Sequence, residues 1–139
     1  LELCRETAEN ESPEVWIHAA AVLDYYSEAE DGKKPSGADN WQIDLSPGPK
    51  HIAELSDLVT ESIRIGFKLE SSVDVDTLLQ RARNQIERYG VDAVVANIME
   101  EMNDPEKIRA RIVHSNGQVE EIQDDSSLTK AIHRIISTD

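Results

Sequence analysis

One stretch restricts the folds open to this chain more than any other, namely residues 63–70. Its first five residues form a largely apolar run, typical of a buried parallel strand, and Lys68, Leu69 and Glu70 follow at once. Ligands bind outside the carboxyl ends of the strands in an open α/β sheet, so residues 67–70 are expected to border a crevice. The composition leaves one alternative open, a buried strand whose Lys68 and Glu70 simply reach solvent.

Two further apolar segments predict neighbouring strands of the same parallel sheet. Residues 15–23 and 93–96 are almost wholly apolar, and at these lengths a buried strand is favoured over a helix. Asp24 and Asn97 follow these strands directly. Because parallel strands direct their carboxyl ends to one edge of the sheet, Asp24, Phe67 and Asn97 are expected to surround one crevice.

Helical patterns separate the predicted strands. Pro49 suits the first turn of a helix over residues 49–61, and another helix begins after the capping residue Asp74 and ends at Gly90. A weaker helical pattern covers residues 1–11. This alternation predicts an α/β fold, a Rossmann-like parallel sheet with right-handed crossover helices.

The last third of the chain predicts antiparallel structure. Residues 108–114 and 118–122 flank Asn116 and Gly117, a strong signal for a β-hairpin. A helix that begins near Ser126 is expected to close the chain. A C-terminal antiparallel hairpin therefore completes the predicted sheet.

Length, charge and cysteine usage limit the function classes. The 139 residues fit one domain, so residues 1–139 are treated as a single α/β domain. Asp and Glu number 28 against 14 Lys and Arg, and the net charge of −14 repels nucleic acid and anionic membranes, neither of which is an expected partner. Cys4 is the single cysteine, which indicates a reducing, cytoplasmic location. No apolar run approaches the length of a membrane span.

The sequence contains no familiar catalytic motif. It lacks a glycine-rich phosphate loop, a dinucleotide fingerprint, a Gly-x-Ser-x-Gly elbow and a His-Glu-x-x-His helix. His18, inside the first strand, is interpreted as a satisfied core or edge histidine. In the polar loop over residues 27–40, Lys33 and Lys34 are the only adjacent lysines, and the pair is either a solvated turn or an anion clamp. A short half-buried strand is predicted after this loop, at residues 41–45.

Several segments, in this order and spacing, carry a resemblance to a known family. They are His18-Ala19-Ala20-Ala21-Val22-Leu23-Asp24-Tyr25, Lys33-Lys34-Pro35-Ser36-Gly37, Gly66-Phe67-Lys68-Leu69-Glu70, Ala82-Arg83 with Tyr89, and Asp92-Ala93-Val94-Val95-Ala96-Asn97. From about residue 15 to residue 139 the chain resembles the phosphopantothenate-cysteine ligases, also called phosphopantothenoylcysteine synthetases. In many bacteria these enzymes form the C-terminal half of a DNA/pantothenate metabolism flavoprotein that serves coenzyme A synthesis.

The resemblance implies a Rossmann-like fold and a ligation driven by ATP or CTP with Mg²⁺. The carboxylate of 4′-phosphopantothenate attacks the nucleotide α-phosphate, pyrophosphate leaves, and the amine of cysteine then displaces the nucleoside monophosphate. Such a reaction needs positioning and charge neutralisation rather than a protein nucleophile. The nucleotide phosphates would hold most of the Mg²⁺ coordination, and neither a catalytic residue nor a protein metal ligand is assigned.

The family's nucleotide- and substrate-binding residues carry over onto this sequence by position. They comprise the first strand end, a lysine of the polar loop, the segment that runs past the nucleotide, an aromatic ring with its adjacent cation, and the polar group at the third strand end. These residues are Ala20, Ala21, Asp24, Lys33, Gly48, Pro49, Lys50, His51, Phe67, Lys68 and Asn97.

The chain also departs from the family pattern. The family's N-terminal half, with a glycine-rich opening and an Asn-Ser-Ser-Gly segment, has no counterpart, so ligation is expected to need that half or another chain that supplies it. A homodimer is also expected. Gln85 and Tyr89 stand where CTP-using relatives carry lysines, which favours ATP. Two alternatives remain open, a non-catalytic nucleotide-binding module and a structural α/β domain that works through a protein interface.

Overall fold

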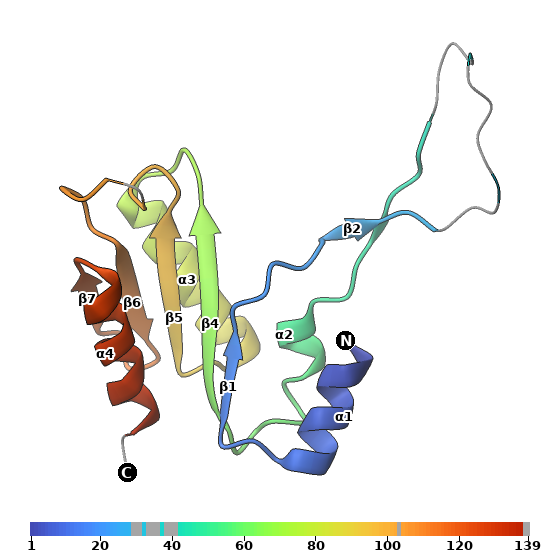
Figure 1. The fold of residues 1–139 in the computed structure, drawn as a ribbon, viewed down its shortest axis with the longest axis horizontal. Coiled ribbons are helices and arrows are strands. Elements are labelled where there is room, and N and C mark those ends of the chain that lie inside the picture. Colours follow the sequence, from blue (N-terminus) through green and yellow to red (C-terminus); the bar gives the residue numbers. More distant parts are fainter. Residues whose placement is uncertain (29–31, 33–36, 38–41, 103, 138–139) are drawn as a thin grey trace.

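The computed structural model describes residues 1–28, 32, 37, 42–102 and 104–137, and within them it contains a five-stranded sheet, a two-stranded sheet and four helices (Figure 1). In chain order the elements are α1 (Glu2–Glu11), β1 (Val15–His18), β2 (Tyr25–Tyr26), β3 (Ser46–Pro47), α2 (His51–Glu54), β4 (Ile63–Glu70), α3 (Val75–Tyr89), β5 (Ala93–Ile98), β6 (Ala110–His114), β7 (Val119–Ile122) and α4 (Asp125–Ile136).

The main sheet has the strand order β1-β4-β5-β6-β7. The first three strands are parallel, whereas β6 runs antiparallel to β5 and β7 antiparallel to β6. The β6–β7 hairpin turns at Asn116 and Gly117, and Gly117 adopts a φ of 88° that side chains with a Cβ rarely tolerate. The predicted α/β class, with a parallel half and a C-terminal hairpin, is confirmed.

Helices α3 and α4 cover opposite faces of this sheet (Figure 1). Successive side chains of a strand point to opposite faces, and β5 is buried on both. The face that carries Val94 packs against Leu78 and Ala82 of α3. The face that carries Val95 packs against the apolar side of α4, which includes Ile132. Fully burying a side chain such as Leu78 contributes about 1.5 to 3 kcal/mol, so these two cores fix the position of β4 and β5.

The ends of the two long helices follow from their sequences. Asp74 caps α3 by accepting a hydrogen bond from the amide of Thr77 at 2.8 Å, and Gly90 ends the helix with a φ of 64°. Asp124 caps α4 in the same way through the amide of Ser127, two residues before the predicted Ser126. Across the described chain, no helix is long and apolar enough to cross a membrane.

The first strand is shorter than predicted. β1 ends at His18, so the strand predicted over residues 15–23 is wrong in its second half. His18 lies opposite Gly66, and within the described residues β4 then continues to Glu70 without a partner on that side. Residues 19–24 are exposed and leave the sheet, and the alanines among them have little β propensity.

The helix predicted over residues 49–61 is also wrong in extent, because α2 stops after one turn. Tight turns follow it, including one in which the Leu58 amide donates to the Leu55 carbonyl oxygen at 3.1 Å. Leu55 and Val59 are buried with Ala8 of α1 in a small third core. The apolar spacing is present, but these side chains anchor α1 instead of extending a helix.

The strands β2 and β3 form a narrow antiparallel ribbon that stands away from the body of the molecule as an arm, residues 22–28 and 42–47 (Figure 1). The strand predicted over residues 41–45 is wrong for residues 42–45, because pairing occurs at β3 instead. Trp41 lies outside the described residues. The arm leaves the sheet at the end of β1, beside the open edge of β4.

Candidate functional site

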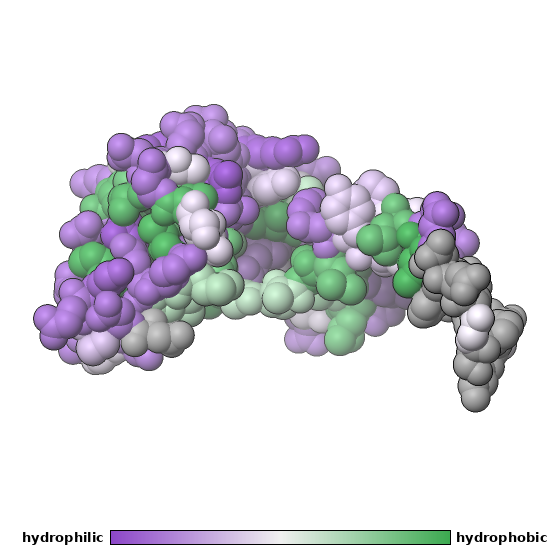
Figure 2. Space-filling model, turned by 90° about the horizontal axis from the view of Figure 1, so that it is seen from above, coloured by the Kyte–Doolittle hydropathy of each residue, from purple (hydrophilic) through white to green (hydrophobic). Residues whose placement is uncertain are grey.

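A cavity of about 270 Å³ lies at the carboxyl end of β1, between the sheet and the segment that contains α2. Figure 2 looks down on this edge of the sheet and shows apolar residues where the body meets the arm. Ligand sites typically combine apolar walls with a few polar groups, as this cavity does. Its lining residues are Cys4, Trp16, Ile17, His18, Ala20, Val22, Asp24, Lys50, His51, Ile52, Leu55, Phe67 and Gln85.

Several predicted site residues come together here, although they lie far apart in the sequence. Ala20, Asp24, Lys50, His51 and Phe67 all line the cavity. The first two come from the segment after β1, the next two from the start of α2, and the last from β4. The structure thus joins three of the predicted segments at one place.

Gly48 explains how the segment before α2 reaches the end of β1. Its amide donates to the carbonyl oxygen of Asp24 at 2.7 Å. A Cβ at this position would lie 2.9 Å from the carbonyl oxygen of Leu23, closer than real Cβ contacts. Glycine therefore permits a close backbone approach that places Pro49 and Lys50 next to the cavity. Ala21 is not a lining residue, but both of its neighbours in the sequence are.

Lys50 and Asp24 form an ion pair at the cavity. The hydrogen bond from Lys50 holds the pKa of the Asp24 carboxyl below its usual range, and the charge of Lys50 acts in the same direction. Both side chains are more than half exposed, so the pair contributes little to stability. An ammonium group has three N–H donors, which leaves Lys50 able to donate to a ligand as well.

His18 is a cavity residue that the sequence did not indicate. Burial lowers its pKa to about 4, and the positive charges of Arg64 and His51 act in the same direction. The imidazole is therefore neutral at pH 7. As the pH falls from about 6.5 toward 4, the unfolded chain binds a proton that the folded chain does not, so the free energy of unfolding decreases. Its Nε2 is buried without a hydrogen-bond partner among the described residues, so the interpretation as a satisfied histidine is wrong. The alternation that puts Trp16 and His18 on one side of β1 is the signal for its position.

Gln85 of α3, which the sequence indicated only for the choice of nucleotide, also lines the cavity. A Cβ at position 66 would lie 2.6 Å from Nε2 of Gln85, so the amide rests directly on the backbone of Gly66. An isolated glycine within a strand often marks such a close approach, and this is the sequence signal that points to the contact. Gln85 thereby forms the wall of the cavity on the α3 side of β4.

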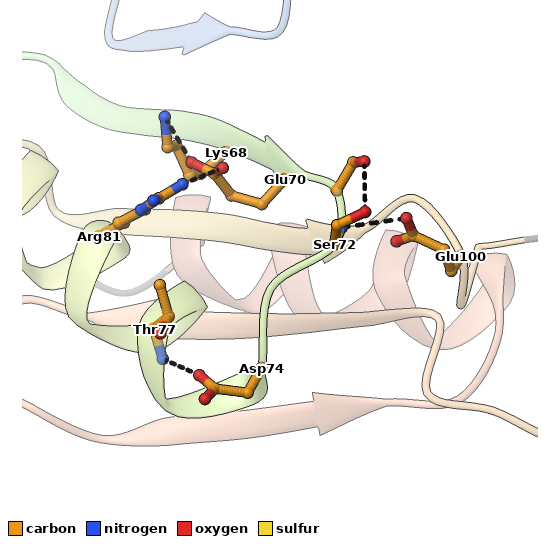
Figure 3. A network of polar contacts seen from close by, with 8 residues as sticks. Lys68, Glu70, Ser72, Asp74, Thr77, Arg81 and Glu100 are labelled. Carbon is orange, nitrogen blue, oxygen red and sulfur yellow. Dashed lines mark hydrogen bonds and ion pairs between the residues drawn. The ribbon is translucent and has the colours of Figure 1, made fainter.

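At the end of β4, Glu70 is held in a polar network (Figure 3). Its carboxylate accepts from Lys68 at 3.0 Å and from Arg81 of α3. Burial raises the pKa of Glu70, but the hydrogen bonds and charges of Lys68 and Arg81 outweigh it and hold this pKa below its usual range. The side chain is 13% exposed, so the alternative in which Glu70 simply reaches solvent is wrong. Figure 3 also shows the amide of Ser72 donating to Glu100 at 3.0 Å, which ties the turns after β4 and β5 together.

The third predicted strand end does not join the cavity. Asn97 is buried, and its Nδ2 donates to the carbonyl oxygen of Arg109 at 2.9 Å, on the way into β6. The structure therefore brings Asp24 and Phe67 together and leaves Asn97 apart, because β6 pairs along that side of β5. Lys33 of the polar loop lies outside the described residues.

The arrangement suits an organic ligand with one flat or apolar part and one polar or anionic part. Ile52, Leu55 and Phe67 offer apolar contact, and Lys50 offers a positive charge. The neutral His18 and the amide of Gln85 can each accept or donate a hydrogen bond. The chemistry supported by these groups is binding and orientation of a ligand.

Two curated relatives share sequence with this chain. It is 32% identical over 99 residues to the coenzyme A biosynthesis bifunctional protein CoaBC of Thermococcus kodakarensis, an alignment that covers 71% of this chain and 25% of the relative. It is 40% identical over 86 residues to the phosphopantothenate–cysteine ligase of Mus musculus, which covers 59% of this chain and 27% of the relative. The chain thus spans about a quarter of the length of these relatives.

A solved structure and a family profile extend the likeness over nearly the whole chain. The DNA/pantothenate metabolism flavoprotein from Streptococcus pneumoniae superposes with a TM-score of 0.75 at 22% identity, covering 96% of this chain and 68% of the other, which establishes a shared fold. The profile of the family described as DNA/pantothenate metabolism flavoprotein C-terminal domain matches residues 2–138. The chain belongs to this family, the DNA/pantothenate metabolism flavoprotein C-terminal domains.

Proposed function

We propose that this chain supplies the nucleotide-binding part of a phosphopantothenate-cysteine ligase in coenzyme A biosynthesis. The observation that carries the proposal is the cavity that joins Asp24, Lys50 and Phe67 at the carboxyl end of the parallel strands. The names of the two curated relatives support the same activity. An adenine ring packs on Phe67 in this proposal, and Lys50 faces the phosphates.

The proposed reaction proceeds through an acyl-nucleotidylate. The carboxylate of 4′-phosphopantothenate attacks the α-phosphate, the bond to pyrophosphate breaks, and the cysteine amine then displaces the nucleoside monophosphate to form the amide. The chain's own residues bind and orient in these steps, with Lys50 and the loop residue Lys33 offsetting phosphate charge. ATP is the proposed nucleotide because Gln85 and Tyr89 replace the lysines of CTP-using relatives.

Mg²⁺ enters this proposal with the nucleotide. Among the described residues, no group of three or more His, Cys, Asp or Glu side chains is arranged to hold a metal ion. Mg²⁺ in nucleotide-using proteins is bound largely by phosphate oxygens and water. We therefore treat Mg²⁺ as part of the substrate and assign it no ligand from this chain.

The polypeptide that supplies the family's N-terminal half is assigned to the free side of β1 in this proposal. Among the described residues only β4 pairs with β1, and an edge of this kind can accept a further strand. The relatives extend far beyond the part that this chain matches. We place the protein in the cytoplasm. The chain alone is expected to lack ligase turnover, and turnover by the chain alone would contradict this assignment.

A nucleotide titration tests the proposed site. ATP with Mg²⁺, at a hundred times its dissociation constant, should raise the free energy of unfolding by about 2.7 kcal/mol. CTP at the same concentration should raise the free energy of unfolding by a smaller amount. Phe67→Ala should abolish most of the increase, whereas Leu69→Ala, two positions along the same strand and outside the cavity, should retain it. No stabilisation by either nucleotide would favour the structural-domain alternative, and stabilisation without turnover in the reconstituted enzyme would favour the non-catalytic module.

A homodimer formed through the arm is the second part of the proposal. Six large apolar side chains of the arm are exposed, and β2 and β3 pair through only two residues each, so that an isolated ribbon of this size is at best marginally stable. A two-fold axis would pack the same surface of two copies together. The six residues are Val22, Leu23, Tyr25, Tyr26, Ile43 and Leu45.

Sedimentation equilibrium tests the dimer. Leu45→Glu, which puts a charge into the apolar surface of the arm, should convert a dimer into a monomer. Leu3→Glu is the matched control, because Leu3 is also an exposed leucine, at 74% against 60% for Leu45, but lies on α1 outside the arm. A monomeric unaltered chain, or equal effects of the two substitutions, would contradict the arm as the interface.

A further inference from the structure

A second hollow, of about 200 Å³, lies on the α3 side of β4 and has a strongly cationic lining. Asn84 and Gln85 lie three and four positions after Arg81, and Arg88 lies four and three positions after them, so the four residues share one face of α3. Lys68 meets them from the strand. The hollow has no carboxylate among its lining residues. In a chain of net charge −14, such a gathering of cations is unusual and attracts anions.

The charges in this hollow are only partly neutralised. Lys68 and Arg81 converge on the single carboxylate of Glu70 (Figure 3). Arg88 lies 5.6 Å from the centre of the Tyr89 ring, a contact between a cation and an aromatic face. Three positive charges therefore face one negative charge. Lysine has three N–H donors and arginine five, so each retains donors beyond those directed at Glu70.

The amides in the hollow are oriented as donors. Oδ1 of Asn84 accepts a hydrogen bond from Nε2 of Gln80 at 2.9 Å, which leaves the two hydrogens of its own Nδ2 for another acceptor. Nε2 of Gln85 lies over Gly66, between this hollow and the cavity described above. A ligand that presents several oxygens and more than one negative charge matches this set of donors better than a single carboxylate does.

We propose that Lys68, Arg81, Asn84 and Arg88 form a binding site for a phosphate group. The shared chemistry is a tetrahedral oxyanion that carries close to two charges. It can come from free phosphate or pyrophosphate, or from the phosphate of a ligand that also occupies the neighbouring cavity, since Gln85 lines both. The site does not depend on the proposed ligase function.

Titration of the isotope-labelled chain with inorganic phosphate tests the site by NMR. The arginine Nε–H signals of Arg81 and Arg88 should shift to saturation, and higher salt should weaken the binding. Arg88→Gln should weaken it about tenfold or more, the usual consequence of losing a charge-assisted hydrogen bond. Arg83→Gln is the matched control, because it removes the same charge from the same helix outside the hollow. Shifts that do not saturate, or equal weakening by both variants, would overturn the proposal.

Two further titrations identify the source of the phosphate. If ATP displaces inorganic phosphate, and Phe67→Ala removes this displacement while phosphate itself still binds, the hollow holds a phosphate of a ligand seated in the cavity. If pyrophosphate displaces it and ATP does not, the hollow takes a free anion. In the second case the site stands whether or not ATP stabilises the chain against unfolding, so the two proposals are tested separately.

Discussion

Replacing Arg64 with leucine is expected to lower the free energy of unfolding by about 3 kcal/mol. Arg64 is only 4% exposed, and its guanidinium donates to the carbonyl oxygen of Tyr89 at 2.7 Å and to that of Ile52 at 2.9 Å, with a longer contact to Gly90. Leucine would fill much of the space but would leave these acceptors without a donor. Urea-induced unfolding at pH 7, analysed at a constant m value, measures the difference.

Arg5→Leu provides the control for this substitution. Arg5 pairs with Glu54 on the surface, where both side chains are over 40% exposed, and a loss below about 1 kcal/mol is expected there. If Arg64→Leu lowered the free energy of unfolding by a similarly small amount, this would contradict the role of Arg64 in holding β4, α2 and the end of α3 together.

The second large effect is expected at Glu101, in the turn after β5. Glu101→Leu should cost about 3 to 5 kcal/mol, because it removes the close partner of a buried charge and leaves, among the described residues, only the carboxylate of Glu121, at 3.9 Å, beside it. That charge belongs to Arg111 in β6, which is 4% exposed and donates to the Glu101 carboxylate at 2.6 Å. Thermal unfolding monitored by circular dichroism would show the loss as a lower midpoint temperature.

Removing both charges separates this explanation from a general packing defect. The double variant Glu101→Leu with Arg111→Met should regain stability to within about 1 kcal/mol of the unaltered chain, because well-packed apolar residues replace a buried ion pair at little cost. A double variant as unstable as Glu101→Leu alone would show that the turn, and not the unpaired charge, determines the loss.

Elements defined by local pattern could be predicted from the sequence. Residues 63–70 form β4, and the apolar face between Asp74 and Gly90 forms α3, because cap, periodicity and stop all lie within the segment itself. The turn at Asn116 and Gly117 fixed the hairpin in the same way.

Extent and partners were harder to predict. Residues 15–23 are apolar throughout, but a strand continues only where a neighbour pairs with it, and pairing with β4 stops at His18. Likewise, the apolar spacing of Leu55 and Val59 does not say whether the residues share a helix or separate turns. Their partner, α1, is distant in the sequence, so no local pattern could identify it.

The candidate site, too, could be predicted only in part. Asp24 and Phe67 meet at the cavity because β1 ends at His18, opposite Gly66, so that the chain leaving β1 passes the next residue of β4. Asn97 was predicted to follow a strand end, but it lies inside β5, and its side chain donates to the carbonyl oxygen of Arg109 just before β6. The burial of His18 depends on how α2 packs across β1, and no sequence pattern describes that packing.

The order of the strands has a consequence for how the molecule opens. The pair of β6 and β7 nearest their turn, Val113 with Val119, is six positions apart, whereas β1 reaches β4 by pairing Val15 with Ile63, 48 positions away. Closing the longer loop costs about 2 kcal/mol more entropy, and the segment it attaches has its own small core of Ala8, Leu55 and Val59. Residues 1–62 are therefore expected to detach from the sheet in local unfolding before β4 to β7 separate. The cavity is lined by residues from both parts, so a bound ligand would hold them together and suppress this first step of local unfolding.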